Sequence, residues 1–298
     1  MKVRIGVSIG ALATPDRLGD AARLLEKTGI DSLWLSEVVY GPLVEPFVGM
    51  THALAVTESL KVGTGVAVLP GRHPVLVAKQ LTSLAALAPR RVLPVFGLRP
   101  ARRPEIAAFP VPGPRAAVFD EAMELLRLLL AQDEVTYSGQ FFSVESATAG
   151  PRPAKPLDIW LGGSAPEGLR RAGRLADGWL GSFLTPAEAG TAREQIEAAA
   201  AAAGREIEDD HFGISLAVAD GEVPADLALA VSRRRPGVDP RSLLSLSWAE
   251  LAESIGAYVE AGLSKFVVRP AATRPADGDA ALRQFVDEFA EHMLPLQN

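Results

Sequence analysis

The chain has 298 residues, a formal net charge of −6 and a pI of about 5.4, which argues against a nucleic-acid binder because such proteins normally carry a basic stripe. Hydrophobic residues make up 48% and charged residues 22%, a balance that favours a large folded core over a disordered chain. There is no cysteine, which excludes disulfides, thiolate metal ligands and cysteine nucleophiles and leads us to expect a cytoplasmic protein. Because no signal-peptide pattern and no run of about twenty apolar residues is present, we expect no membrane span.

The first half of the chain repeats a strand followed by a helix. Short apolar runs predict strands at residues 3–9, 31–35, 61–68 and 91–96, and helices are predicted at 15–27, 45–58 and 74–88. The strands begin about thirty residues apart, which is the length of one βα unit. They are almost continuously apolar, as expected for a parallel sheet that is buried on both faces.

The same pattern resumes in the second half. Strands are predicted at 158–161, 178–181, 212–218 and 265–268, with helices at 166–175, 186–203, 246–261 and 277–293. Eight units in series favour an α/β fold of the (β/α)₈ TIM-barrel type, with residues 1–298 forming one domain. A dinucleotide-binding Rossmann domain is disfavoured, since Gly6 and Gly10 after the first strand lack the third glycine of that motif.

Three segments depart from the repeat, at about residues 99–114, 132–156 and 220–245. The first holds five prolines, the second predicts a hairpin over 134–144, and the third is predicted to be irregular. Loops that directly follow barrel strands cover the catalytic face, so the first and third segments are expected there, where both could act as lids. The basic run at 232–235 is followed by Pro236 and Gly237, and we predict a solvated loop there.

Polar residues and glycines at the ends of strands two and three are candidates for a site. Ser36 and Glu37 end strand two at the mouth of the barrel, where Glu37 could act as a base, orient a ligand or form a salt bridge. Gly65 lies inside strand three, where glycine often marks a bulge or a close approach to a ligand. His73 is a candidate catalytic residue with Glu37, although its place before Pro74 equally fits a helix start.

Gly162 and Gly163 follow strand five. Exposed N–H groups at a helix N-terminus bind anions, so the pair predicts a phosphate site, with a simple turn as the alternative. Ser164 and Glu167 have capping-box spacing, which needs no ligand. The chain has no His-Glu-x-x-His, Walker or Gly-x-Ser-x-Gly motif, so we expect no metal site and no serine hydrolase.

Three stretches together resemble the bacterial luciferase-like family: LWLSE, GTGVAVLPGRHPVLVAKQ and PLDIWLGGSAPEGLRRAGRLADGW. They are most similar to its actinobacterial branch of F420-dependent oxidoreductases, and the resemblance runs over most of the chain in order. It implies a barrel, a homodimer, and either FMN or the deazaflavin F420 lying across the barrel mouth.

The resemblance also implies roles for individual residues. Gly65 and Val66 match a bulge with a non-proline cis peptide against the cofactor ring, and Ser36 and Glu37 match the position that approaches this ring from strand two. The cofactor phosphate maps to Gly162, Gly163 and Ser182. Gly97 is what remains of a Gly-x-Gly at the end of strand four, and Val38 replaces a histidine of many relatives, which leaves the proton donor unassigned.

The function that these observations favour is hydride transfer between F420 and an unknown small organic substrate. An FMN-dependent monooxygenase fed by a separate reductase and a non-catalytic cofactor-binding barrel remain alternatives. F420 is favoured over FMN because four arginines follow strands three and four and could meet the carboxylates of its oligoglutamate tail. These are Arg72, Arg99, Arg102 and Arg103.

Overall fold

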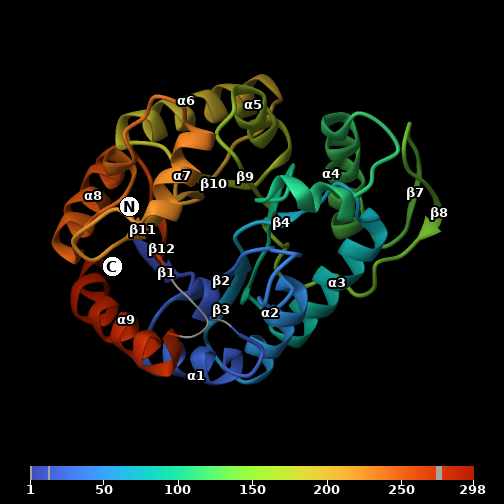
Figure 1. Cartoon of the computed structure of the whole chain (residues 1–298). Helices are drawn as coiled ribbons and strands as arrows, with labels where there is room; N and C mark the ends of the chain where they lie inside the picture. Colours follow the sequence, from blue (N-terminus) through green and yellow to red (C-terminus); the bar gives the residue numbers. More distant parts are fainter. Residues whose placement is uncertain (1, 13, 273–276) are drawn as a thin grey trace.

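The computed structural model describes residues 2–12, 14–272 and 277–298, which form a ring of strands surrounded by helices (Figure 1). The strands of the ring are β1 (Arg4–Val7), β2 (Ser32–Leu35), β3 (Lys61–Thr64), β4 (Ala67–Val68), β5 (Val92–Leu93), β6 (Val95–Gly97), β9 (Trp160–Gly162), β10 (Gly178–Ser182), β11 (Phe212–Val218) and β12 (Lys265–Pro270). All of their pairings are parallel, in the order β4-β6-β9-β10-β11-β12-β1-β2-β3-β5.

These ten strands occupy the eight predicted positions because the third and fourth predicted strands are each interrupted. Gly65 and Val66 separate β3 from β4, and Pro94, which has no N–H to donate to a ladder, separates β5 from β6. β3 pairs with β5, whereas β4 pairs with β6 and β6 with β9. The strand order begins with β4, the second half of the third predicted strand, and ends with β5, the first half of the fourth predicted strand. Because these two predicted strands are neighbours, the sheet closes into the predicted barrel.

A helix follows each strand position, and proline occupies the first turn of four helices. The helices are α1 (Leu18–Thr28), α2 (Pro46–Ala55), α3 (Pro74–Leu87), α4 (Arg115–Ala131), α5 (Pro166–Leu175), α6 (Pro186–Ala202), α7 (Ala225–Arg234), α8 (Trp248–Glu260) and α9 (Gly278–Met293). Pro46, Pro74, Pro166 and Pro186 start α2, α3, α5 and α6, where a missing N–H costs no helical hydrogen bond. Within the described residues, no helix combines the length and apolar composition needed to cross a membrane.

The core lies between the strand ring and the helices and continues into the barrel. Trp179, Phe96, Phe212 and Phe266 are among its largest fully buried side chains. Burying a large apolar side chain stabilises a fold by about 1.5–3 kcal/mol. The strands are buried along nearly their whole length, which explains their continuous apolar pattern.

The segment at 220–245 corrects two predictions. It is not irregular, since it contains α7 and a short 3₁₀ helix, η3 (Pro240–Leu243). The basic run at 232–235 is not a solvated loop, because it includes the last turn of α7. α7 buries only Leu227 and Val231 and leaves Leu229 half exposed. Its apolar periodicity is therefore too weak to predict a helix from the sequence.

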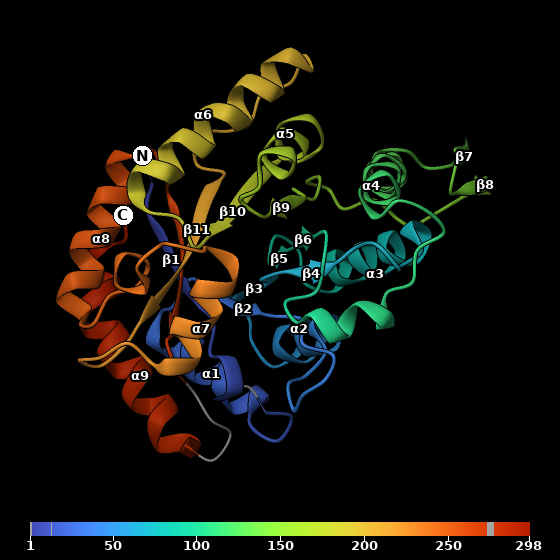
Figure 2. The same cartoon turned by 45° about the horizontal axis from the view of Figure 1, so that its top comes forward.

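The other two excursions have the predicted character. Residues 99–114 are irregular except for the 3₁₀ helix η2 (Arg103–Ala108). The predicted hairpin is present as β7 (Val135–Ser138) and β8 (Ser143–Ala147), an antiparallel pair that lies at the edge of the molecule beyond α4 (Figure 2).

Candidate active site

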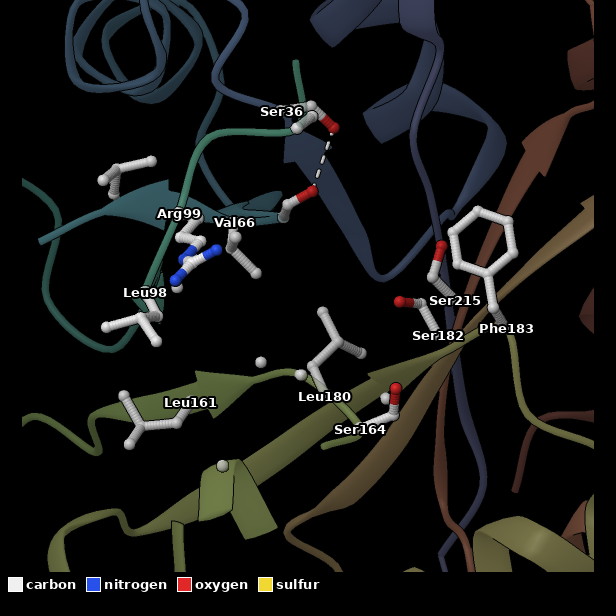
Figure 3. Close-up of a pocket in the computed structure, with 18 of the residues that line it drawn as sticks. Ser36, Val66, Leu98, Arg99, Leu161, Ser164, Leu180, Ser182, Phe183 and Ser215 are labelled. Atoms are coloured by element: carbon white, nitrogen blue, oxygen red, sulfur yellow. Dashed lines mark hydrogen bonds between the residues drawn. The ribbon is translucent and has the colours of Figure 1, made fainter. Parts of the chain in front are cut away.

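A cavity of about 700 Å³ opens at the C-terminal ends of the barrel strands (Figure 3). It brings together every predicted site residue except His73. From strands two to four these are Ser36, Glu37, Gly65, Val66 and Gly97, and from strands five and six they are Gly162, Gly163 and Ser182. The barrel thus gathers residues that lie up to 146 positions apart in the sequence.

His73 lies outside this cavity. It is exposed at the N-cap of α3, where its Nδ1 accepts a hydrogen bond of 3.3 Å from the Val75 N–H. Its ring packs edge-on against Phe142 of the hairpin, with 5.6 Å between ring centroids. Its position fits the helix-start alternative and gives no support to a catalytic role.

The bulge between β3 and β4 is held by the end of β2. The Gly65–Val66 peptide is cis, as predicted. The Ser36 hydroxyl donates to the Gly65 carbonyl oxygen at 2.9 Å, a bond that Figure 3 shows, and the Glu37 N–H donates to the Val66 carbonyl oxygen at 3.3 Å. Both backbone carbonyls of the bulge are therefore fixed from the neighbouring strand.

The Glu37 carboxylate forms a buried salt bridge with Arg72. Its Oε2 accepts hydrogen bonds from the Val68 N–H at 2.6 Å and from Arg72 Nη1 at 3.0 Å, and its Oε1 accepts one from Arg72 Nη2. The Arg72 guanidinium also lies over the rings of Phe47 and Phe109. Of the three roles considered for Glu37, which were base, ligand-orienting group and salt-bridge partner, the structure shows the salt bridge. The same salt bridge holds the Arg72 side chain in place.

Two of the site glycines make room for the Val66 side chain. A Cβ added at Gly97 would lie 2.6 Å from Val66 Cγ2, and one added at Gly162 would lie 2.8 Å from Val66 Cγ1. Such contacts are too short to exist without movement, and the β-branched Val66 has little rotamer freedom to move. Gly162 is therefore required by a neighbour 96 positions away, a reason the sequence does not reveal.

We expect Gly162→Ala to lower the free energy of unfolding by about 1–3 kcal/mol, the usual cost of overpacking. Val66→Ala should relieve the clash, so the double variant should lose much less than the sum of the two single variants. Urea unfolding of the four proteins measures this coupling. Strict additivity would contradict the assigned contact.

Gly163 differs from Gly162 in being open to the cavity. Its φ of +113° favours glycine, no heavy atom lies within 4 Å of an added Cβ, and its carbonyl accepts a 2.8 Å bond from Trp179 Nε1. The predicted capping box is wrong, because Ala165 is the N-cap of α5 and Glu167 pairs with Arg170 instead. Without a capping side chain, the N-terminus of α5 presents backbone donors to the cavity, which suits an anion.

The opposite part of the rim comes from α7, which sequence reasoning missed. Arg235 donates to the Phe183 carbonyl oxygen and pairs with Glu188, while the Arg234 guanidinium lies 5.1 Å from the Phe183 ring centroid. Both arginines line the cavity. A basic run followed by proline and glycine carries no signal that it will fold over a site some 70 residues upstream.

Comparison with known proteins gives a consistent assignment. Residues 1–240 match the sequence profile described as luciferase-like monooxygenase. An F420-dependent glucose-6-phosphate dehydrogenase of Kineococcus radiotolerans is 25% identical over 95% of this chain and 93% of its own length.

Solved structures share the fold at lower sequence identity. An F420-dependent secondary alcohol dehydrogenase in complex with an F420–acetone adduct covers 100% of both chains with a TM-score of 0.80 and 20% identity. The oxygenating constituent of a Pseudomonas putida 3,6-diketocamphane monooxygenase, in complex with FMN, covers 99% of both with a TM-score of 0.75 and 16% identity. At these identities the likeness shows the fold alone.

Proposed function

The chain belongs to the luciferase-like monooxygenase family, and we propose that it is an oxidoreductase that transfers hydride between F420 and a small organic substrate. One observation carries this proposal. A single cavity has a rigid backbone bulge bearing Val66 on one side and the donor-rich N-terminus of α5 on the other. The F420-dependent relative that aligns over 95% of the chain supports F420 as the cofactor.

The residues present fit a tricyclic cofactor with a phosphate. Val66, Leu161 and Leu180 supply apolar surface for a ring, and the cavity volume lies within the range of about 300–1,000 Å³ typical of ligand pockets. The backbone N–H groups of Gly163, Ser164, Ala165, Glu167 and Gly168 would receive the phosphate, whereas Pro166 has no N–H to offer. When bound, F420 supplies the hydride chemistry, and the chain supplies binding, orientation and exclusion of water.

Among the described residues that line the cavity, the two carboxylates are Glu37 and Glu167. Both Glu37 oxygens accept hydrogen bonds from Arg72, and Oε2 also accepts one from the Val68 N–H, so we assign Glu37 a positioning role at the bulge. Glu167 pairs with Arg170 at the helix start. The candidate hydroxyls for contacts to a substrate are those of Ser182 and Ser215, which lie side by side in Figure 3. This proposal departs from the family resemblance, which gives Ser182 to the cofactor phosphate.

We also propose that residues 1–298 form one domain and that the chain acts as a homodimer. Val48 on α2 and Leu76 and Leu87 on α3 are 63%, 65% and 77% exposed. Such apolar side chains on neighbouring outer helices suit an interface between copies.

A titration with F420, with F420 lacking its glutamates, and with FMN, each at low and moderate salt, tests the cofactor. We expect full-length F420 to bind most tightly. Of the four arginines considered for its tail, Arg99 alone lines the cavity, while Arg72 is tied to Glu37 and Arg102 donates to the Tyr40 carbonyl.

Because Arg99 is exposed, its pairing with a tail carboxylate is worth about 0–1 kcal/mol, and Arg99→Gln should weaken F420 binding by no more than about fivefold. The same substitution should leave FMN binding unchanged and should matter less at moderate salt. Tighter binding of FMN than of full-length F420 would overturn the cofactor choice.

A further inference from the structure

Arg269 lies at the C-terminal end of β12 and faces the cavity. In the parallel pairing of β11 with β12, Ser215 lies opposite Val267 and Ala217 lies opposite Arg269. Arg269 follows Val267 by two residues and therefore lies on the same face of the strand. Both residues line the cavity. Sequence reasoning gave Arg269 no role, because it is one charged residue at the end of an apolar run.

The guanidinium of Arg269 has no partner within the described residues. The other deeply placed arginines of this cavity and its surroundings are paired, Arg72 with Glu37 and Arg171 with Asp120. Arg269 makes no such hydrogen bond or ion pair, and the charge beside it is the like charge of Arg234. Burial, and then repulsion from Arg234, lower the pKa of Arg269 from its ordinary value.

The side chains named around Arg269 are a second guanidinium and two hydroxyls, all of which can donate hydrogen bonds and none of which carries a negative charge. Ser182 and Ser215 are register partners on β10 and β11, and their hydroxyls lie side by side at the cavity wall (Figure 3). Neither makes a side-chain hydrogen bond within the part of the chain that the structure describes. The Arg234 guanidinium uses one N–H for the Ala101 carbonyl at 3.2 Å, which leaves further donors.

A partly buried guanidinium without a counter-charge is costly unless a ligand supplies one. Planar guanidinium groups bind carboxylates and phosphates through two parallel hydrogen bonds, and serine hydroxyls can donate to the remaining oxygens. The N-terminus of α5 forms a second, separate set of donors, the backbone N–H groups of Gly163, Ser164, Ala165, Glu167 and Gly168. The cavity therefore offers two anion sites, and a cofactor phosphate would occupy only one of them.

We propose that Arg269, Arg234, Ser182 and Ser215 form a subsite for an anionic group of the substrate, a carboxylate or a phosphate. This inference rests on the proposed function, since it assigns the other anion site to the cofactor. It narrows the substrate to small organic molecules that carry a carboxylate or a phosphate.

The test is calorimetric titration of inorganic phosphate into the full chain, once free and once loaded with F420. We expect phosphate to bind the loaded protein, Arg269→Gln to weaken this binding at least tenfold, and Arg269→Lys to weaken it less. Arg233→Gln is the matched control, because Arg233 lies in the last turn of α7 but outside the cavity lining, and it should change nothing. Binding of F420 to the Arg269→Gln variant, followed by fluorescence, should stay within about twofold and also shows that the variant folds.

Two results would overturn the subsite. Equal phosphate affinity in the wild type and in Arg269→Gln would remove Arg269 from it. Competition between phosphate and F420 for one site would give the anion site to the cofactor. If F420 fails to bind at all, the proposed function fails, while the phosphate titration of the free wild type and variant still decides whether the anion site exists.

Discussion

Glu37→Ala is expected to lower the free energy of unfolding by about 3–5 kcal/mol, the cost of removing one partner from a buried ion pair. The Glu37 side chain is 3% exposed and that of Arg72 is 21% exposed, so solvent can do little to replace the lost carboxylate. The Val68 N–H loses its acceptor at the same time. Arg72 would keep its contacts with the rings of Phe47 and Phe109, and the carboxylate left beside it would be that of Glu45, which is 43% exposed.

The same change should loosen the bulge and thereby weaken cofactor binding. Glu37 holds the bulge through its backbone N–H to Val66, which alanine keeps, and holds the adjoining strand β4 through its carboxylate to Val68, which alanine lacks. We expect F420 affinity to fall at least tenfold in Glu37→Ala. The F420 affinity of Glu37→Gln should fall between those of Glu37→Ala and the wild type, since its amide oxygen can still accept from the Val68 N–H while the negative charge that pairs with Arg72 is lost.

Glu45→Gln is the matched control for both measurements. Glu45 also contacts Arg72, at 3.3 Å, but its side chain is 43% exposed, and glutamine can keep the hydrogen bond that caps α2. It should cost about 0–1 kcal/mol, as exposed pairs do. If urea unfolding shows that Glu37→Ala and Glu45→Gln lower the free energy of unfolding by similarly small amounts, the buried pair of Glu37 and Arg72 does not hold the bulge.

The barrel was predictable from the sequence because its signal is repeated. Each strand position is a short apolar run, and the spacing of about thirty residues appears several times, so the errors of single assignments average out. What could not be predicted depends on single contacts. To predict the break at Pro94 one must know that β5 and β6 pair with different strands, β3 and β4. To explain the glycine at 162 one must know where the Val66 side chain lies.

The part of the candidate site that strands two to six supply was predicted, and the part supplied by α7 and β12 was not. Ser36, Gly65 and Gly163 stand beside strand ends with recognisable polar or glycine signals, and the cavity includes them all. Arg234 and Arg269 carry no local signal, because an arginine at a helix end or a strand end is ordinary. Their meaning comes from the absence of a counter-charge among the described neighbours, which is a property of the folded chain.

At the opposite end of the barrel, one carboxylate holds two lysines. Asp31, which precedes β2, pairs with Lys61 at the start of β3 and with Lys265 at the start of β12. The side chains of Asp31 and Lys265 are 11% and 10% exposed, and Lys265 also lies 5.7 Å from the centroid of the Trp34 ring. Asp31 is thus the counter-charge that permits a lysine to be buried at the bottom of the barrel.

Asp31→Asn is expected to cost about 3–5 kcal/mol at pH 7, because it leaves Lys265 buried without a counter-charge. Burial by itself would raise the pKa of Asp31, but the charges of Lys265 and Lys61 and their hydrogen bonds outweigh it and hold that pKa well below its ordinary value. A carboxylate whose pKa is lower in the folded state than in the unfolded state, where it is about 3.9, stabilises the fold above that pH. This stabilisation is lost as the pH falls further, toward the folded pKa.

The stability gap between wild type and Asp31→Asn should therefore be widest near neutral pH and should narrow as the pH falls from about 5 to 2. Urea unfolding at several pH values measures the gap, with Asp20→Asn as a control, since the Asp20–Arg23 pair is exposed and should contribute about 0–1 kcal/mol. The double variant Asp31→Asn with Lys265→Met removes both buried charges, and methionine can keep the contact with Trp34. It should recover most of the loss, because well-packed apolar residues replace buried ion pairs at little cost. A gap that is independent of pH, or a double variant no more stable than Asp31→Asn, would show that Asp31 acts through packing and not as the counter-charge of Lys265.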